Sequence, residues 1–225
     1  MADARQDGPC PAARSAPGSM AGARPRLAAP WQSYPVTSVQ PADPAAKPPP
    51  HVRIVQLPGP VFCALADGDL AAANALSPVS LPAYFASPEW AGTWRMRSEQ
   101  VEQDPASAAW VTGVIWDEQQ QVAVGRAGYH GPPDPSWMVE IGYAVDPAYR
   151  RRGYARAALE ALLARAAREP QVRTVRVSIS PDNTASFDLA SQYGFAEVGE
   201  QWDDEDGLEI IYEVDAGRCR SSRGS

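Results

Sequence analysis

Residues 140–163 read EIGYAVDPAYRRRGYARAALEALL, and this stretch decides how the rest of the chain folds. Its first part is an apolar run rich in branched and aromatic side chains, which is typical of a buried strand. Its last part places apolar side chains at helical spacing, and the pair Glu169-Pro170 ends that pattern. The segment RRRGYA, residues 150–155, is therefore predicted to be the loop and first helical turn that follow a strand.

Three consecutive arginines before a glycine can serve a nucleic-acid patch, a membrane tag, a phosphate cradle or ordinary surface charge. The chain carries a net charge of -7, which argues against general attraction to nucleic acid or to an anionic membrane. At the start of a helix, unpaired backbone amides and the helix dipole stabilise an anion. Gly153 lets backbone approach that anion closely, because it has no Cβ. The position of RRRGYA therefore favours a phosphate cradle.

Other common sites are not indicated. A Walker loop requires GxxxxGK[ST] and a dinucleotide site GxGxxG, and neither pattern occurs. The three cysteines lack metal-ligand spacing and the chain has two histidines, so we expect no disulfide framework and no metal site. Apolar runs are shorter than the roughly 18 residues of a membrane span, and no signal-peptide core precedes the domain. We therefore expect a cytoplasmic protein with neither nucleic-acid nor membrane partners.

The chain is expected to hold one folded domain between two tails. Residues 1–50 contain 11 of the 23 prolines and no strand or helix period, which predicts a disordered N-terminal tail. Residues 216–225 are expected to be a loose C-terminal tail. The domain of residues 51–215 is predicted to be mixed α/β. Strands are expected at residues 51–57, 108–116, 121–129, 137–145, 172–180, 194–202 and 208–215, with helices near 67–76, 87–101, 154–168 and 183–193.

The motif and its surroundings resemble the GNAT superfamily of N-acetyltransferases. The family's pyrophosphate signature [QR]xxGx[GA] is met by Arg150, Gly153 and Ala155. A second segment, VSISPDNTASFDLASQYGFAEVGE at residues 177–200, matches the other half of the family core. The resemblance covers residues 108–214 well and 51–107 only in general layout, and it is closest to the branch that acetylates the N-termini of ribosomal proteins. It implies an antiparallel meander followed by a βαβαββ half with a splayed central pair of parallel strands.

The resemblance implies acetyl-CoA as the acetyl donor, without a metal. Its pyrophosphate would lie on backbone amides of the loop, and its pantetheine arm would pair with strand backbone in the gap between the splayed strands. Asn183 is the family's polar contact to the arm, and an N-cap of the following helix is the alternative role. The residues implied in binding are Tyr143, Ala144, Val145, Arg150, Arg151, Arg152, Gly153, Tyr154, Ala155 and Asn183.

The resemblance also suggests candidates for proton transfer. Glu140 is an acid within an apolar strand, at the end where the family places its catalytic glutamate, and it is expected either as general base or as a structural or substrate-orienting carboxylate. Many members of the family carry a tyrosine that acts as general acid, and that position is Ala190 here. Tyr193 is expected in the core. Ser186 is therefore the candidate proton donor to the leaving thiolate, with a helix-face serine as its alternative. The Val145 amide is the expected oxyanion donor.

The implied reaction moves an acetyl group directly to a primary amine of a protein N-terminus, a lysine or a small molecule. The acidic turn at residues 203–206 either attracts a cationic acceptor or is ordinary solvated surface. Trp90, Trp94 and Trp116 either line the acceptor side or pack in the core. A CoA-binding or interaction module without catalysis and a transferase of longer acyl groups stay as alternatives, and either a monomer or a homodimer is compatible.

Overall fold

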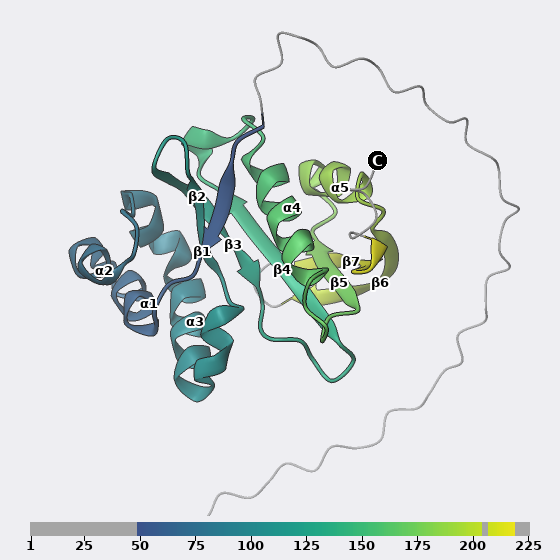
Figure 1. The fold of residues 1–225 in the computed structure, drawn as a ribbon, viewed down its shortest axis with the longest axis horizontal. Helices are drawn as coiled ribbons and strands as arrows, with labels where there is room; N and C mark the ends of the chain where they lie inside the picture. The colour runs from purple at the N-terminus through teal and green to yellow at the C-terminus, as the bar shows by residue number, and fades with distance from the viewer. Residues whose placement is uncertain (1–48, 204–206, 219–225) are drawn as a thin grey trace, which may run out of the picture. The chain divides into compact units, whose positions relative to one another are not determined.

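The computed structural model of the protein describes residues 49–203 and 207–218, and the fold is discussed for these residues. The two predicted tails fall almost wholly outside them, as do three residues of the acidic turn. The described chain forms a seven-stranded mixed sheet in the order β1-β2-β3-β4-β5-β7-β6 (Figure 1). The strands are β1 Val52–Val55, β2 Gly113–Asp117, β3 Val122–Tyr129, β4 Met138–Val145, β5 Thr174–Ile179, β6 Ala196–Asp203 and β7 Gly207–Asp215.

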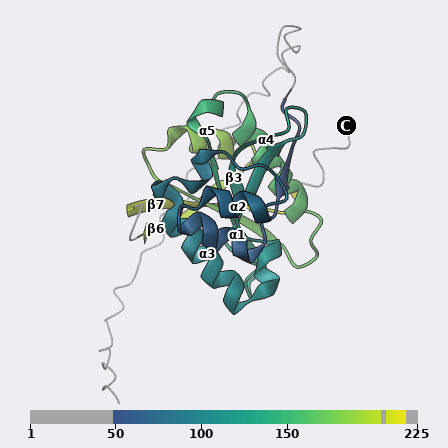
Figure 2. The ribbon, with the colours of Figure 1, turned by 90° about the vertical axis from the view of Figure 1, so that its left-hand side faces the viewer.

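Helices cover both faces of this sheet. In Figure 1, α1, α2 and α3 lie at the β1–β3 end, α4 lies in front of the middle of the sheet and contacts both β1 and β4, and α5 lies near the β5–β7 end; Figure 2 shows the first three helices facing the viewer. Their bounds are α1 Gly59–Ala66, α2 Leu70–Leu76, α3 Ala91–Gln103, α4 Tyr154–Ala166 and α5 Thr184–Ser191. The predicted mixed α/β fold is thus confirmed, and its helices lie on both faces of the sheet.

Strand β2 separates two hydrophobic cores. Ile115 belongs to the core formed with α4 and α5, whereas Val114 and Trp116 belong to the core formed with α1, α2 and α3. Because successive side chains of a strand point to opposite faces, this alternation places one core on each side of the sheet. Trp94 is fully buried in the second core, so the core interpretation of that residue is confirmed.

Two segments differ from the expected elements. Helix α1 is absent from the predicted elements because its segment GPVFCALA is apolar on nearly every side and gives no amphipathic period. Strand β2 begins at Gly113 rather than near residue 108, because Asp104 and Pro105 start a 3-10 helix that runs to Ala109. The N-cap of α2 is Asp69, whose carboxylate accepts a hydrogen bond from the Ala72 amide at 2.9 Å.

The central parallel pair separates along its length. Strands β4 and β5 pair only at Met138 with Thr174, Val139 with Val175 and Glu140 with Arg176. Beyond Glu140, β4 remains paired with β3 on its other edge, and β5 remains paired with β7. The splayed strand pair is therefore confirmed, and it leaves one backbone edge of residues 141–145 facing a gap.

Close packing of backbone against backbone at Gly128 provides a test of the sheet. A Cβ at this position would lie 2.6 Å from Cα of Thr112 and 2.7 Å from the Val111 carbonyl oxygen. We expect Gly128→Ala to lower the free energy of unfolding by about 2 kcal/mol in urea titrations, because backbone cannot move aside as a side chain can. Gly199→Ala in β6 is the control, since nothing lies within 4 Å of its added methyl. Equal stability of the two variants would contradict the described packing.

Candidate functional site

A cavity of about 980 Å³ lies where β4 and β5 separate. Consecutive residues of both strands line it, 141–143 on β4 and 177–179 on β5. These residues lie where the two strands no longer pair, so the cavity opens between the facing edges of β4 and β5. The predicted site residues that it brings together are Glu140, Tyr143, Asn183 and Ser186.

Glu140 projects from β4 into the wall of this cavity with 17% of its side chain exposed. The Ser178 hydroxyl donates a hydrogen bond of 2.6 Å to its Oε1. Gln201 in turn donates to the Ser178 hydroxyl at 3.3 Å. The carboxylate is thus held from the facing strand, while its second oxygen is directed toward His130.

His130 is a site residue that the sequence does not single out. Its Nδ1 lies 3.9 Å from Oε2 of Glu140, and its imidazole occupies space that a side chain at Gly142 would fill, with Nε2 only 3.0 Å from the ideal Cβ position. The backbone is fixed as well, because its carbonyl accepts hydrogen bonds from Arg97 at 3.0 Å and Gln100 at 2.8 Å. A lone histidine at the end of a strand carries no spacing signal, which is why only the fold reveals it.

The surroundings of His130 favour its neutral form. Removal of water around the imidazole lowers its pKa, and the positive charges of Arg97 and Arg126 lower it further. The carboxylates of Glu140 and Asp203 oppose this shift without reversing it. At neutral pH the ring therefore has a nitrogen that can accept a proton.

Tyr143 and the start of α5 form the opposite wall. The Asn183 side chain accepts a hydrogen bond from the Ser186 amide at 3.1 Å, so its N-cap role is confirmed. Burial raises the pKa of the Tyr143 hydroxyl, and hydrogen bonding with the Ser186 side chain only partly offsets this. Two hydroxyl groups that stay protonated at neutral pH consequently meet at this wall.

The loop from residue 150 to residue 153 turns sharply into the N-terminus of α4. Arg151 and Gly153 adopt left-handed backbone conformations, with φ of 61° and 84°. The first helical hydrogen bond of α4 at this end runs from the Ala157 amide to the Gly153 carbonyl, so the preceding amides have no carbonyl partner within the helix. Arg150 directs its Nε to the Val145 carbonyl at 3.2 Å, which fastens the loop to the end of β4.

A buried network anchors the first turn of α4. The Tyr154 hydroxyl donates to the Asp117 carboxylate at 2.6 Å, and Gln120 donates to both groups. Burial disfavours ionisation of Asp117, but hydrogen bonds from Tyr154, Gln120 and Gln119 outweigh it and lower the pKa of the carboxyl. Burial and this contact together raise the pKa of Tyr154 to about 12. The predicted loop residue Tyr154 therefore contributes an inward-pointing side chain that holds the turn.

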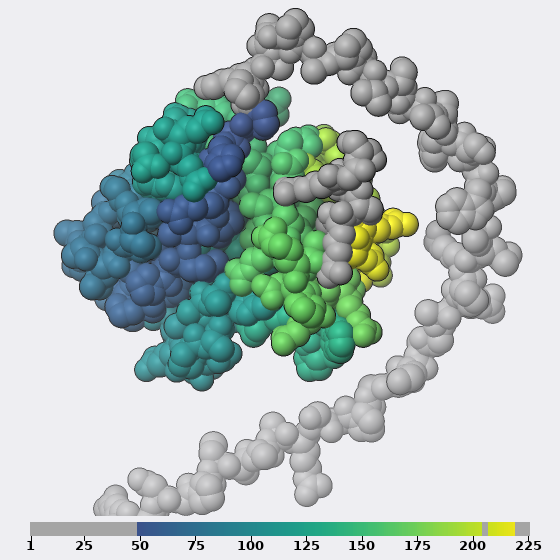
Figure 3. All heavy atoms as spheres, in the orientation of Figure 1, coloured from purple at the N-terminus to yellow at the C-terminus, as the bar shows by residue number. Residues whose placement is uncertain are grey.

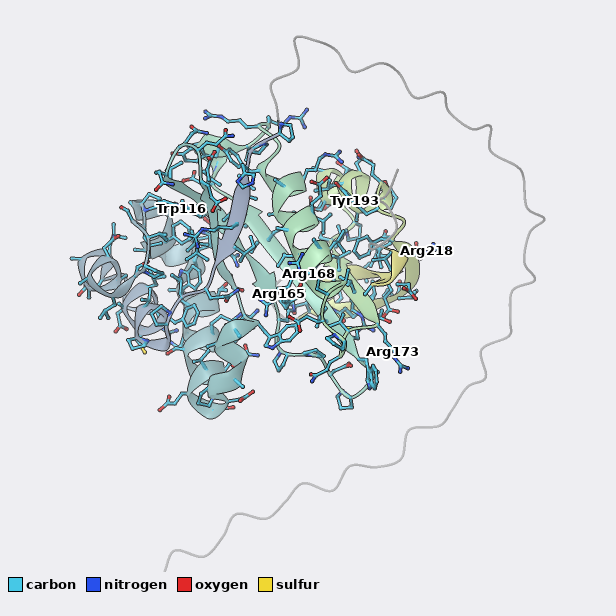
Figure 4. All side chains as sticks on the ribbon, viewed as in Figure 1. Trp116, Arg165, Arg168, Arg173, Tyr193 and Arg218 are labelled. Atoms are coloured by element: carbon cyan, nitrogen blue, oxygen red, sulfur yellow. The ribbon has the colours of Figure 1, made fainter. Side chains whose placement is uncertain are left out.

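Tyr193 and the tryptophans lie outside this arrangement. The hydroxyl of Tyr193, labelled at α5 in Figure 4, donates to Glu160 of α4 and accepts from Arg156. Its side chain does not line the cavity, and neither do Trp90, Trp94 and Trp116. The expectation that Tyr193 packs structurally rather than serving the site agrees with this position.

The charged residues of the cavity wall are mainly acidic. Four carboxylates and two arginines line it, and Asp203 is the one described residue of the acidic turn among them. The charged lining residues are Glu99, Glu140, Asp203, Glu209, Arg97 and Arg126. Within residues 49–203 and 207–218, no group of three potential ligands is arranged to hold a metal, and no helix is long and apolar enough to cross a membrane.

Comparison with known proteins identifies relatives of this chain. A sequence model of the acetyltransferase (GNAT) domain matches residues 64–196. L-2,4-diaminobutyric acid acetyltransferase of Streptomyces anulatus is 44% identical over 66 residues, which are 29% of this chain and 38% of that protein. The chain spans less than half the length of the curated relatives it matches.

Solved structures share the fold at low sequence identity. Spermidine/spermine N-acetyltransferase SpeG from Vibrio cholerae superposes with a TM-score of 0.54 at 11% identity, over 76% of this chain and 98% of that one. RimL, a ribosomal L7/L12 alpha-N-protein acetyltransferase in complex with coenzyme A, gives a TM-score of 0.51 at 18% identity, over 74% of this chain and 94% of that one. At these identities the likeness concerns the fold.

The buried carboxylate beneath the loop predicts a pH-dependent contribution to stability. Because the pKa of Asp117 is lowered in the folded state, its stabilisation is present above the unfolded pKa of about 3.9 and is lost as the pH falls through the folded pKa. We expect Asp117→Asn to lower the free energy of unfolding by about 2 kcal/mol at pH 7, with the difference narrowing below pH 4.

The measurement is urea unfolding across a pH series. Asp67→Asn, at an exposed position after α1, is the control and should leave stability unchanged across the same range. A gap between wild type and Asp117→Asn that is independent of pH would show that the ionised carboxylate is not what holds Tyr154.

Proposed function

Because the matched domain covers more than half of the chain, the protein belongs to the GNAT acetyltransferase family, and we propose that it transfers the acetyl group of acetyl-CoA directly to a primary amine. The observation that carries this proposal is the position of β4. Its open edge faces the gap beside Glu140, and its far end leads directly into the anion-binding loop. A donor with a pyrophosphate and an amide-bearing arm fits both features of the same strand.

The loop supplies the donor's anionic end with amides and charge. The amides of residues 151–155 and the positive end of α4 stabilise the pyrophosphate, and Arg151 and Arg152 are exposed beside it. The open edge at Tyr143, Ala144 and Val145 offers backbone groups to the amides of the pantetheine arm. An arm bound there runs from the loop into the cavity and directs its thioester toward Glu140.

Glu140 is the proposed proton acceptor for the ammonium form of the acceptor. Its Oε1 is occupied by Ser178, so Oε2 and the neighbouring neutral imidazole of His130 are the proton-accepting atoms nearest the acceptor side. A proton taken by the carboxylate can pass to the half-exposed imidazole and then to water. Deprotonation leaves the amine lone pair available to attack the thioester carbonyl.

The opposite wall serves the leaving group. Ser186 is the proposed proton donor to the thiolate. The Tyr143 hydroxyl keeps its proton at neutral pH, is hydrogen-bonded to the Ser186 side chain and can reprotonate Ser186. The Val145 amide is the proposed donor to the oxyanion of the tetrahedral intermediate. The carbon–sulfur bond of the thioester breaks as the amide forms, and the thiolate takes up a proton as the thiol.

The acceptor is proposed to be cationic before it reacts. Four carboxylates against two arginines give the cavity wall a negative balance, which concentrates ammonium groups. Relatives named for diaminobutyric acid and a structural neighbour named for spermidine and spermine act on amines of this kind. Diaminobutyrate is therefore the first small amine to assay, beside polyamines and peptides.

Binding of acetyl-CoA by the loop is tested with two glycines that share a left-handed conformation. Gly153 has φ of 84° and Gly194 has φ of 77°, so an alanine at either position strains the backbone by about 1 kcal/mol. We expect Gly153→Ala to weaken acetyl-CoA binding at least about tenfold in calorimetry, because relaxation of its strained φ moves the backbone amides at the start of α4 that are proposed to hold the pyrophosphate. Gly194→Ala should bind as wild type does, and equal affinities would contradict the cradle.

Catalysis is tested at Glu140 by following thiol release over the amine panel. We expect Glu140→Gln to lower kcat about a hundredfold and to keep its affinity for acetyl-CoA, since the amide cannot accept the proton. Glu169→Gln, on a surface pair with Arg165, is the control and should keep full activity.

Each remaining outcome has a distinct meaning. Full activity of Glu140→Gln would reassign the carboxylate to a structural role. Acetyl-CoA binding without turnover on any amine would favour a binding module. A preference for longer acyl-CoA donors would identify a transferase of longer acyl groups.

A further inference from the structure

Strand β6 ends the sheet and is unusually exposed. It is the last strand in the order β5-β7-β6, and among the described residues no further strand pairs with its outer edge. Its first five residues are all exposed. An unpaired strand edge presents backbone donors and acceptors that another extended chain can use.

Large apolar side chains are exposed on the β6–β7 hairpin and on α5. Trp202 is 75% exposed, Val198 55%, Phe187 44% and Leu208 40%. Trp202 and Leu208 are direct cross-strand partners and so share one face of the hairpin, which stands at the protein surface in Figure 3. An exposed apolar pair of this kind, above all one that includes a tryptophan, is typical of a binding surface.

The same edge carries only negative charge. The sequence of β6 is AEVGEQWD, with three carboxylates and no basic residue. Glu197 and Glu200 are exposed. Antiparallel pairing of two β6 strands from two copies would bring like charges together across the edge, which is destabilising. A cationic extended chain, by contrast, complements the β6 edge both in charge and in its backbone hydrogen-bonding groups.

The edge leads into the catalytic cavity. Trp202 and Asp203 at the end of β6 line that cavity together with Glu140, and so does Glu209 on β7. The register of β6 with β7 is regular from Gly199 to Asp203, after a shift between Glu197 and Gly199. A short extended segment on this stretch therefore has one end at the mouth of the cavity.

Resting on the proposed acetyl transfer, we propose that the outer edge of β6 docks an extended, basic and apolar segment of an acceptor polypeptide, whose amine enters the cavity past Trp202. Backbone hydrogen bonds to the edge hold the segment without demanding one sequence. The carboxylates select basic residues, and the exposed apolar groups pack against the alternate side chains. The acceptor class is thus a basic polypeptide in addition to any small amine that fits the cavity alone.

The test compares two peptides that have a free amino terminus as their only amine, Arg-Val-Arg-Val-Arg-Val and Glu-Val-Glu-Val-Glu-Val, with L-2,4-diaminobutyrate as a small amine. The protein variant is the double substitution Glu197→Lys and Glu200→Lys, which reverses the edge charge outside the residues that line the cavity. Asp67→Lys, an exposed reversal after α1, is the matched control. Thiol release gives kcat and KM, and calorimetry measures peptide binding independently of turnover.

We expect the basic peptide to bind at least about tenfold more tightly than the acidic one, and the double variant to raise its KM about tenfold with kcat unchanged. The KM for diaminobutyrate should not change, and Asp67→Lys should affect neither substrate. Equal binding of the two peptides, or equal effects of the double variant on peptide and small amine, would overturn the docking surface. A change in sedimentation of the double variant would also overturn it, because the edge would then belong to a second copy.

The two proposals fail in different ways. If diaminobutyrate or another small amine is acetylated and neither peptide binds, the docking surface is wrong and the transferase stands. If acetyl-CoA itself does not bind, the proposed function is wrong. Charge-selective peptide binding without turnover would support docking and count against the proposed acetyl transfer to that peptide.

Discussion

The separation of β4 from β5 after Glu140 is the constraint on which the rest of the site depends. A sheet that stayed paired would bury these backbone groups and close the cavity. Each strand can leave the other because it keeps an antiparallel partner on its far side, β3 for one and β7 for the other. The cavity therefore forms where β4 and β5 do not pair, and the β3–β4 and β5–β7 pairs stabilise the sheet on either side of it.

The two ends of β4 lie beside opposite electrostatic potentials. At one end, the first turn of α4 offers positive potential to an anion; toward the other, Glu140 and its neighbours offer negative potential to a cation. The ionised Asp117 carboxylate beneath the first turn of α4 accepts hydrogen bonds from Tyr154 and Gln120, which hold its charge in place on the inner side of the turn. Opposite charges thus act within one site and stay apart.

Most of the fold could be predicted from the sequence, because alternating strands and the Gly153 turn leave strong local patterns. The cluster of Glu140, Tyr143, Asn183 and Ser186 followed from the family resemblance, and the structure brings these residues to one cavity. Local patterns could not predict His130, Ser178 or Gln201, because their relation to Glu140 arises from pairing between distant strands. Helix α1 escaped prediction since its exposed side is as apolar as its buried side, which leaves no amphipathic period.

Strand β2 has a consequence for how the protein loses its structure. All five of its residues are buried, and alternate side chains belong to different cores. Neither core can melt while the other remains intact, because both would have to release the same strand. The α1–α3 region and the half of the fold that contains α4 and α5 are consequently one cooperative unit, and heating should not leave one of them folded without the other.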